Sequence, residues 1–86
     1  MFYVYILKSL KDGKLYIGST NDLKRRVEEH NSGKSFSTAP RRPFKIIYYE
    51  AYVSEGDARH REHNLKLGSR ALAQLKKRLE KSLETL

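Results

Sequence analysis

The chain has 86 residues, a net charge of +8 and no cysteine, which limits it to one domain stabilised by packing, without disulfides or a thiolate zinc site. Hydrophobic residues make up 38% and charged residues 33%, so intrinsic disorder is excluded, and the excess of Lys and Arg favours a phosphate-rich partner, above all nucleic acid. The charge is also compatible with a domain that is merely soluble and basic, because net charge does not determine the fold.

The first two segments are predicted to form a hairpin. Residues 2–7, FYVYIL, are aromatic and β-branched with apolar side chains at both parities, which indicates a strand covered on both faces. Residues 11–14 supply an Asp-Gly pair that favours a tight turn, and residues 15–19 resume an alternating strand. The first apolar run ends at Lys8, which is too early for a signal peptide or a membrane span, so we expect a cytoplasmic protein.

A short helix is predicted after the hairpin. Thr20 or Asn21 can cap its start, and the Asn-Ser-Gly of residues 31–33 ends it. Its inward positions recur at helical spacing at Leu23, Val27 and His30. Residues 34–43 contain Ser, Thr, two Pro and two Arg without periodicity, which predicts an exposed basic loop that can contact a nucleic-acid backbone.

The second half of the chain is predicted to contain one strand and two helices. Residues 44–52 form the longest β-prone run and are placed beside the hairpin. Ser54 begins a helix that ends at Gly68, and Ser69 can cap a last helix. The last helix carries an apolar stripe, namely Ala71, Leu72, Leu75, Leu79 and Leu83.

The element order is therefore ββαβαα. It predicts an α+β fold in which one three-stranded antiparallel sheet is flanked by helices. We expect residues 1–86 to form a single domain, with residues 69–86 as an additional C-terminal helix.

Two tyrosines on the hairpin are the first candidate functional residues. Because residues two apart share a strand face, Tyr5 lies with Tyr3, and Tyr16 lies with Gly18. Two phenols on adjacent strands, with space left by Gly18, can form a small polar surface on one face of the sheet. The alternative is purely structural, since tyrosine is a favourable strand residue and the chain has six.

Arg26 and His30 lie one helical turn apart, next to the apolar positions of the first predicted helix. An arginine there can stabilise charge on a phosphoryl oxygen, and a neutral histidine can accept a proton near pH 7. The alternative is an exposed basic pair at the rim of the apolar stripe.

Glu62 falls on or beside the inward face of the second predicted helix. A carboxylate in that place is costly unless it is paired or binds a cation, and Mg²⁺ is often held by only one or two carboxylates. The alternative is an ion pair with Arg26 or Arg59. His60 and His63 lack a third ligand at a recognisable spacing, so a zinc site is not expected.

Taken together, these positions resemble the GIY-YIG nuclease family, especially its small stand-alone members of the UPF0213 type. Residues 3–5, Tyr-Val-Tyr, stand at the first triad with Tyr in place of Gly, and residues 16–18, Tyr-Ile-Gly, match the second triad in full. The likeness continues through residues 21–26, 30–33 and 42–44, and it covers nearly the whole chain. It implies catalytic roles for Tyr5, Tyr16, Arg26, His30 and Glu62.

The resemblance also implies a mechanism. Glu62 would hold one Mg²⁺ or Mn²⁺ at the scissile phosphate, a tyrosine or His30 would take the proton of the attacking water, and Arg26 would stabilise the transition state. Many family members carry an Asn beyond the helix of the glutamate, where this chain offers Gln74 instead. The expected nucleic-acid contacts are Lys34, Arg41, Arg42, Lys45 and Lys66.

The leading function is a cytoplasmic endonuclease that cuts DNA phosphodiesters, at branched or single-stranded structures, in DNA repair or recombination. A chain of this size lacks an evident domain for choosing a substrate, so a partner protein is expected to supply targeting. The main alternative is a nucleic-acid-binding module with little or no catalysis. A third interpretation lays the basic helix of residues 69–86 on a membrane surface, but its leucines are better explained as core, so no membrane partner is expected.

Overall fold

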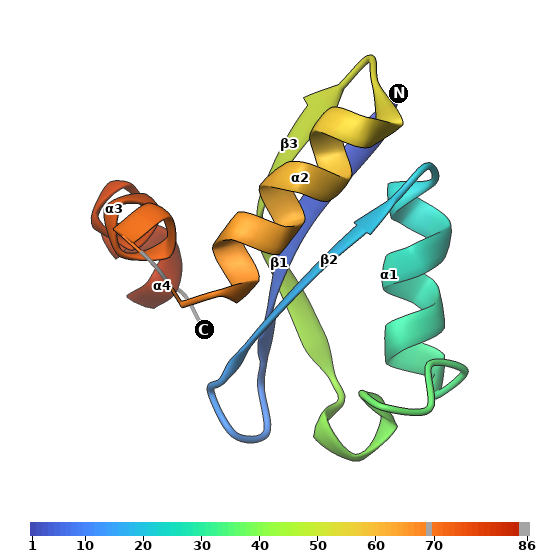
Figure 1. Cartoon of the computed structure of the whole chain (residues 1–86). Helices are drawn as coiled ribbons and strands as arrows, with labels where there is room; N and C mark the ends of the chain where they lie inside the picture. The colour runs from blue at the N-terminus through green and yellow to red at the C-terminus, as the bar shows by residue number, and fades with distance from the viewer. Residues whose placement is uncertain (69, 85–86) are drawn as a thin grey trace.

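The computed structural model describes residues 1–68 and 70–84. Its sheet has three strands, β1 (Phe2–Ser9), β2 (Leu15–Thr20) and β3 (Phe44–Tyr52), in the order β2-β1-β3 with both pairs antiparallel. Its helices are α1 (Leu23–Ser32), the 3-10 helix η1 (Ala39–Arg41), α2 (Glu55–Lys66), α3 (Arg70–Arg78) and α4 (Glu80–Glu84), as Figure 1 shows. The predicted α+β class, with its antiparallel sheet flanked by helices, is confirmed.

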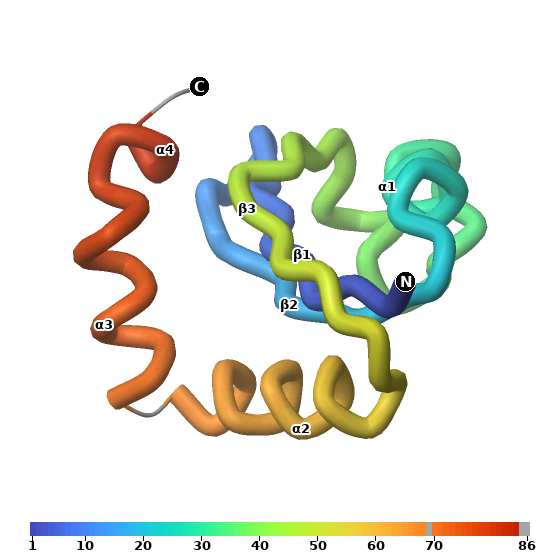
Figure 2. Tube along the Cα trace, turned by 90° about the horizontal axis from the view of Figure 1, so that it is seen from above, coloured from blue at the N-terminus to red at the C-terminus, as the bar shows by residue number. Residues whose placement is uncertain are grey.

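β1 is the central strand, and helices cover both of its faces. This cover on both faces explains why its apolar residues occur at both parities. Val4 and Ile6 lie in one hydrophobic cluster with residues of α2 and α3, whereas Tyr5 and Leu7 lie in a second cluster with residues of α1. Figure 2 shows α1 on one side of the sheet and α3 and α4 on the other. The prediction of a strand covered on both faces is therefore confirmed.

The ends of α1 are set by two local features. Gly33 ends the helix in the left-handed conformation, with φ of 85°, which a glycine adopts without strain. Asp22 caps the start, because its side chain accepts a hydrogen bond from the backbone N–H of Arg25. The prediction of Thr20 or Asn21 as the cap is wrong, because the helix begins at Leu23 and the side chain of Asp22 is the one that accepts from its first turn.

Residues 34–43 form a partly buried segment and not the fully exposed loop that the sequence predicts. The segment contains η1, and Thr38 is only 1% exposed. Ser9 of β1 holds the segment in place by donating a hydrogen bond from its Oγ to the carbonyl of Arg41 at 2.5 Å. The prediction of an exposed loop is wrong because polar groups of this segment find hydrogen-bond partners inside the protein. Amino-acid composition does not show whether such partners exist.

Glu50 of β3 ties the sheet to α2, whose start is capped by Ser54 as predicted. The Glu50 carboxylate accepts hydrogen bonds from the hydroxyls of Tyr48 and Tyr52 and from the guanidinium of Arg61, whose Nε and Nη2 both lie 3.0 Å from it. Burial alone would raise the pKa of Glu50, but Arg61 and the two tyrosines outweigh it and lower that pKa below its ordinary value. The network is therefore charged and internally satisfied.

The C-terminal part forms two helices, where the sequence predicts one helix over residues 69–86. α3 and α4 are separated at Leu79, whose N–H bonds to the carbonyl of Lys76 in a tight turn. The bend carries the chain back toward the sheet, where the Lys8 ammonium donates to the carbonyl of Leu83. The predicted cap Ser69 lies outside the described residues. Within residues 1–68 and 70–84, no helix has the length and hydropathy needed to span a membrane.

Candidate functional site

Tyr5 and Gly18 are cross-strand partners in the pairing of β1 with β2. A Cβ atom built on Gly18 would lie 2.5 Å from the Tyr5 hydroxyl oxygen and 3.1 Å from the ring of Tyr16. Real Cβ atoms do not approach other atoms that closely, so the absence of a side chain at residue 18 is what makes room for the Tyr5 hydroxyl. The final glycine of the Tyr-Ile-Gly triad therefore has a steric role.

A directed chain of hydrogen bonds leads from Tyr5 into the protein. The Tyr5 hydroxyl lies 2.9 Å from Nε2 of His30, and Nδ1 of His30 lies 2.8 Å from Oγ1 of Thr38. Thr38 donates its own hydroxyl hydrogen to the carbonyl of Ser35. Thr38 must therefore accept from Nδ1–H of His30, which leaves Nε2 free to accept from Tyr5. The chain thus assigns the neutral Nδ1–H tautomer to His30.

The pKa values of the two linked groups favour this neutral arrangement. Burial lowers the pKa of His30 below its ordinary value of 6.5, and the neighbouring charge of Arg26 lowers it further. Burial, assisted by Tyr16, raises the pKa of Tyr5 to about 12, although Arg26 acts in the opposite direction. Near neutral pH, the phenol is therefore protonated and the imidazole is a neutral acceptor.

Tyr16 covers this chain on the side of β2. Its ring centroid lies 4.8 Å from that of His30 and 6.3 Å from that of Tyr5. Tyr5 and His30 are fully buried, whereas Tyr16 is half-buried. Of these three rings, Tyr16 is therefore the one that a ligand can reach.

Arg26 of α1 completes the group on this face of the sheet. Its Nη1 forms an ion pair with Oε1 of Glu29 at 3.1 Å, and its Nη2 lies 3.5 Å from Oγ of Ser35. The side chain is 31% exposed, so its charge is both held in place and accessible. His30 is buried, so the alternative of an exposed basic pair is wrong for His30.

Glu62 lies on α2, which packs against the opposite face of the sheet. Ser19 donates its Oγ hydrogen to Oε1 of Glu62 at 2.5 Å, and the Lys66 ammonium lies 2.6 Å from Oε2. Burial would raise the pKa of Glu62, but Lys66 and Ser19 outweigh it and lower that pKa below its ordinary value. The ion-pair partner is therefore Lys66, one turn along the helix, and not Arg26 or Arg59 as the alternative proposed.

β2 separates the two parts of the candidate site. Tyr16 and Gly18 face the cluster beside α1, whereas Ile17 and Ser19 face α2. Because β2 is an edge strand, with α1 and α2 on either side of it in Figure 1, both parts border the same open edge.

The donor set at Glu62 is compatible with an oxygen-preferring ion such as Mg²⁺ or Mn²⁺. The carboxylate and the Ser19 hydroxyl are hard oxygen donors, and such an ion can take its other ligands from water and phosphate. The ion would have to displace Lys66 from the carboxylate. Among the described residues, no three His, Cys, Asp or Glu side chains gather into a closed metal cage.

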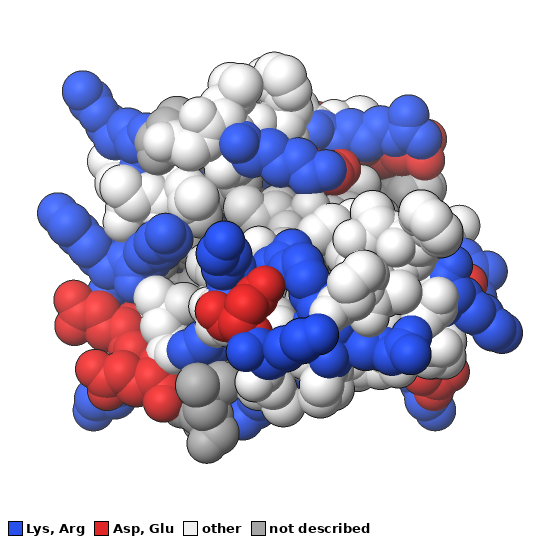
Figure 3. All heavy atoms as spheres, turned by 90° about the horizontal axis from the view of Figure 1, so that it is seen from below, with Lys and Arg blue, Asp and Glu red and all other residues white. Residues whose placement is uncertain are grey.

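The five basic residues that the sequence proposes as nucleic-acid contacts differ in their surroundings. Arg41 pairs with Asp12 at 3.1 Å and stacks over the ring of Phe44, and Lys66 is bound to Glu62. The other three, Lys34, Arg42 and Lys45, are exposed. Figure 3 shows Lys and Arg side chains running across the surface at the end of the molecule that carries the β1–β2 turn and η1.

Sequence reasoning missed Thr38 and Ser19. Ser19 follows the Tyr-Ile-Gly triad, and strand alternation alone directs it to the face opposite Gly18, so this residue could have been found. No pattern marks Thr38, because its contact with His30 depends on how residues 34–43 fold. Gln74 is exposed on α3 and does not line either of the two cavities next to Ser19 and Glu62.

Comparison with known proteins finds matches over most of the chain. Residues 1–80 match the sequence model of the GIY-YIG catalytic domain. A UPF0213 protein from Bacillus pumilus is 42% identical over 69 residues, which span 79% of this chain and 69% of the relative. A UPF0213 protein from Staphylococcus haemolyticus is also 42% identical over 69 residues, which span 79% of this chain and 83% of that relative. The solution NMR structure of a UPF0213 protein from Bacillus halodurans is 39% identical, covers 87% of this chain and 81% of its own, and has a TM-score of 0.52.

Proposed function

Because the chain belongs to the GIY-YIG family of nuclease domains, we propose that it is a cytoplasmic, metal-dependent endonuclease that hydrolyses DNA phosphodiester bonds. We further propose a preference for branched or single-stranded DNA, and targeting by a partner protein. The proposed catalytic unit is the whole chain acting as one domain.

The observation that supports this proposal most is the directed chain from Tyr5 through His30 to Thr38, flanked by Tyr16 and Arg26. A structural core would be satisfied by apolar side chains, whereas this one holds a neutral imidazole, two phenols and a guanidinium. Perturbed titratable groups of this kind are typical of functional sites.

We propose that the tyrosine pair passes the proton of the attacking water to His30: the tyrosine hydroxyl that takes the proton gives up its own hydrogen, and Nε2 of His30 is the final acceptor. Tyr16 is the accessible member, and the hydroxyl hydrogen of Tyr5 is already directed at Nε2 of His30. His30 is buried and both of its nitrogens have partners, so it receives the proton through Tyr5 and does not contact the water itself. This assignment favours a tyrosine over His30 as the group next to the water.

Arg26 and Glu62 are the charged residues of the proposed mechanism. Arg26 stabilises the negative charge that develops on the phosphoryl oxygens, because Glu29 and Ser35 hold its guanidinium in a fixed orientation. Glu62 is the residue that would hold Mg²⁺ or Mn²⁺, and the bound ion would supply Lewis-acid neutralisation of the phosphate. Ser19 orients the Glu62 carboxylate from the neighbouring strand.

Cleavage assays test the proposal directly. Purified protein is incubated with labelled single-stranded, duplex and branched DNA, in Mn²⁺ or in chelator, beside Tyr16→Phe and Glu62→Gln. We expect metal-dependent cleavage that each substitution reduces by about a hundredfold or more. Tyr49→Phe on β3 and Glu28→Gln on α1 are matched controls at exposed positions and should leave the rate unchanged. If the wild type cleaves no substrate in Mn²⁺, the proposed enzyme is ruled out.

One observation favours a nucleic-acid-binding module as the second candidate function. Lys66 neutralises the carboxylate that metal-dependent catalysis requires. A module of this kind would bind DNA without metal, and its affinity would fall steeply with salt because basic residues displace counterions from phosphates. Binding with a flat salt response would reject it.

A further inference from the structure

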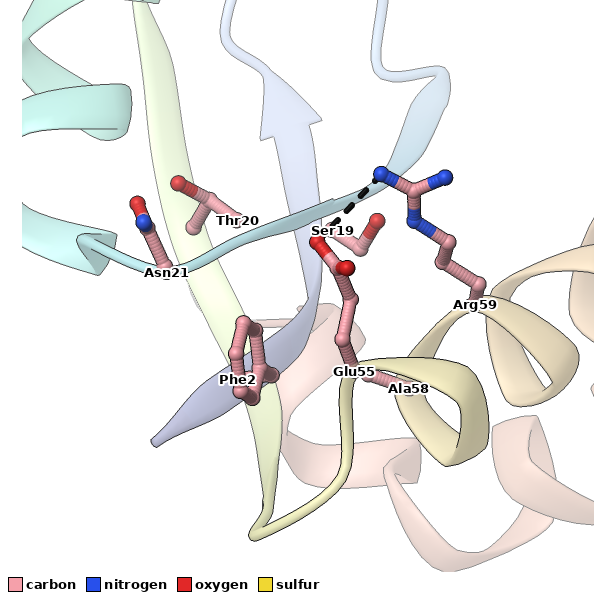
Figure 4. A pocket seen from close by; sticks show the side chains of 7 residues that line it. All are labelled: Phe2, Ser19, Thr20, Asn21, Glu55, Ala58 and Arg59. Atoms are coloured by element: carbon pink, nitrogen blue, oxygen red, sulfur yellow. Dashed lines mark hydrogen bonds and ion pairs between the residues drawn. The ribbon is translucent and has the colours of Figure 1, made fainter.

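A cavity next to Glu62 has no role in the mechanism above. It has a volume of about 250 Å³ and lies where the start of α2 faces the end of β2. Figure 4 shows its lining: the ring of Phe2 stands between Asn21 and Glu55, with Ser19, Thr20 and Arg59 around it. The cavity therefore combines one aromatic face with several polar groups.

This cavity adjoins the surface around Glu62. Ser19 and Arg59 line it, and the same two residues line the neighbouring cavity that contains Glu62 and Lys66. Arg59 lies three residues before Glu62, so the two side chains occupy neighbouring positions on one face of the helix. A strand with one phosphate at Glu62 can therefore place its neighbouring nucleotide beside Arg59.

The polar groups of the cavity are available for a ligand. Arg59 pairs with Glu55 at 3.3 Å, but their side chains are 71% and 56% exposed, and such surface pairs contribute little to stability. A phosphate can therefore replace Glu55 as the partner of Arg59 at small cost. Asn21 is exposed; its amide oxygen accepts a long hydrogen bond from Arg25, at 3.5 Å, and its NH2 group can donate to a ligand.

We propose that this cavity is a subsite for one unpaired nucleotide next to the phosphate at Glu62. Phe2 provides the ring on which the base stacks, Asn21 contacts the edge of the base, and Arg59 binds the connecting phosphate. The proposal rests on the proposed function for the phosphate at Glu62. The subsite would make the protein prefer nucleic acid in which one base next to the bound phosphate is unpaired.

The size of the cavity sets the expected preference. Its volume lies just below the roughly 300–1,000 Å³ of ordinary ligand pockets, so it admits one ring system and not a base pair. A base within a duplex stays stacked and paired, whereas a base in a single strand or at a branch is free to turn into the cavity. The subsite thus selects single-stranded and branched nucleic acid by the accessibility of one base.

An NMR titration without metal tests the subsite apart from catalysis. Isotope-labelled protein in chelator is titrated with thymidine 5′-monophosphate, with deoxyribose 5-phosphate, which lacks the base, and with inorganic phosphate. We expect chemical-shift changes at the amides of Ser19, Asn21 and Ala58, and an affinity for the nucleotide about fivefold or more above that for the sugar phosphate.

Three substitutions assign the contacts. Arg59→Gln should lower the affinity for thymidine 5′-monophosphate and for deoxyribose 5-phosphate by about fivefold. Lys76→Gln on α3 removes the same charge elsewhere and should leave both affinities within about twofold of the wild type. Phe2→Leu keeps an apolar side chain but removes the ring, so the advantage of the nucleotide should disappear. If Phe2→Leu lowers Tm so far that the protein unfolds, Asn21→Ala, at an exposed position, tests the base contact instead.

The outcomes separate the subsite from the nuclease. Equal affinity for the nucleotide and the sugar phosphate, shift changes confined to other surfaces, or no saturable binding would each overturn the subsite. If the wild type nevertheless cleaves DNA, the proposed function still stands. Base-dependent binding at the cavity by a protein that cleaves nothing would support the subsite and reject the enzyme.

Discussion

The hydroxyl of Tyr5 occupies the space that a side chain on Gly18 would need. The contact follows from the register of the hairpin, which pairs Tyr5 with Gly18 and leaves the Tyr5 hydroxyl directed at His30. One glycine therefore supports both the packing of β1 against β2 and the hydrogen-bond chain behind it.

Gly18→Ala should lower the free energy of unfolding by about 1–3 kcal/mol, because the new methyl group forces the Tyr5 ring from its position. Urea unfolding measures the change. Gly56→Ala is the matched control: a Cβ there meets only Oγ of Ser54 at 3.6 Å, and alanine favours the helix by about 0.5–1 kcal/mol, so this variant should be more stable. Equal effects of the two substitutions would contradict the steric role of Gly18.

His30 should make stability fall in mild acid. Its pKa is lowered in the folded protein, so below its ordinary value of 6.5 the unfolded chain binds a proton that the folded chain does not, and unfolding becomes more favourable. Urea unfolding at about pH 7.5 and about pH 5.5 checks this loss. His63→Gln, at an exposed position, should keep the difference, whereas His30→Gln should reduce it. A difference that survives His30→Gln unchanged would show that another group causes it.

Lys66→Gln should tighten the binding of Mn²⁺ by about two- to fivefold, because the ammonium competes with the ion for Oε2 of Glu62. Calorimetry or the electron paramagnetic resonance of Mn²⁺ measures the affinity without DNA. Lys76→Gln removes an equal charge on α3 and should leave the affinity unchanged. Loss of measurable binding in Lys66→Gln would mean that Lys66 supports the ion and does not compete with it.

Glu50→Gln should destabilise the fold by about 2–4 kcal/mol, since it removes the charge that two tyrosine hydroxyls and Arg61 share. The exposed residue Glu55 also pairs with an arginine, but Glu55→Gln should cost at most about 1 kcal/mol. Chemical denaturation compares the two variants. Similar costs would show that partial burial of the Glu50 network adds nothing to its strength.

The antiparallel pairing of the first two strands was predictable from the turn and the alternation between residues 2 and 19, but its register was not. A two-residue Asp-Gly loop would pair Lys11 with Lys14 and so Tyr5 with Thr20, whereas the structure pairs Tyr5 with Gly18. The two-sided apolar run of residues 2–7 indicates a strand covered on both faces, as the structure has it. Single residues were harder to assign where neighbours compete. Thr20, Asn21 and Asp22 are all good caps, and the choice depends on which side chain reaches the free N–H of the first turn.

The surroundings of the site depended on contacts between distant segments. The burial of Thr38 follows from its contact with His30, eight residues earlier, in a segment without periodicity. The break at Leu79 accompanies the return of the chain to the sheet, which a helical pattern cannot encode. The pairing of Glu62 with Lys66 has the ordinary spacing of a helical ion pair, so the sequence did contain that signal.

The position of β2 has a consequence for how substitutions combine. Tyr5 and Glu62 bind different partners on opposite faces of the sheet, so the stability losses of Tyr5→Phe and Glu62→Gln should add within about 0.5 kcal/mol in the double variant. Their effects on cleavage should not add, because residues that serve one reaction step lose most of its benefit when either is absent. A double-mutant cycle would measure both the free energy of unfolding and the cleavage rate. Additive losses of stability together with non-additive losses of rate would show that the two residues are independent in the fold but act together in catalysis.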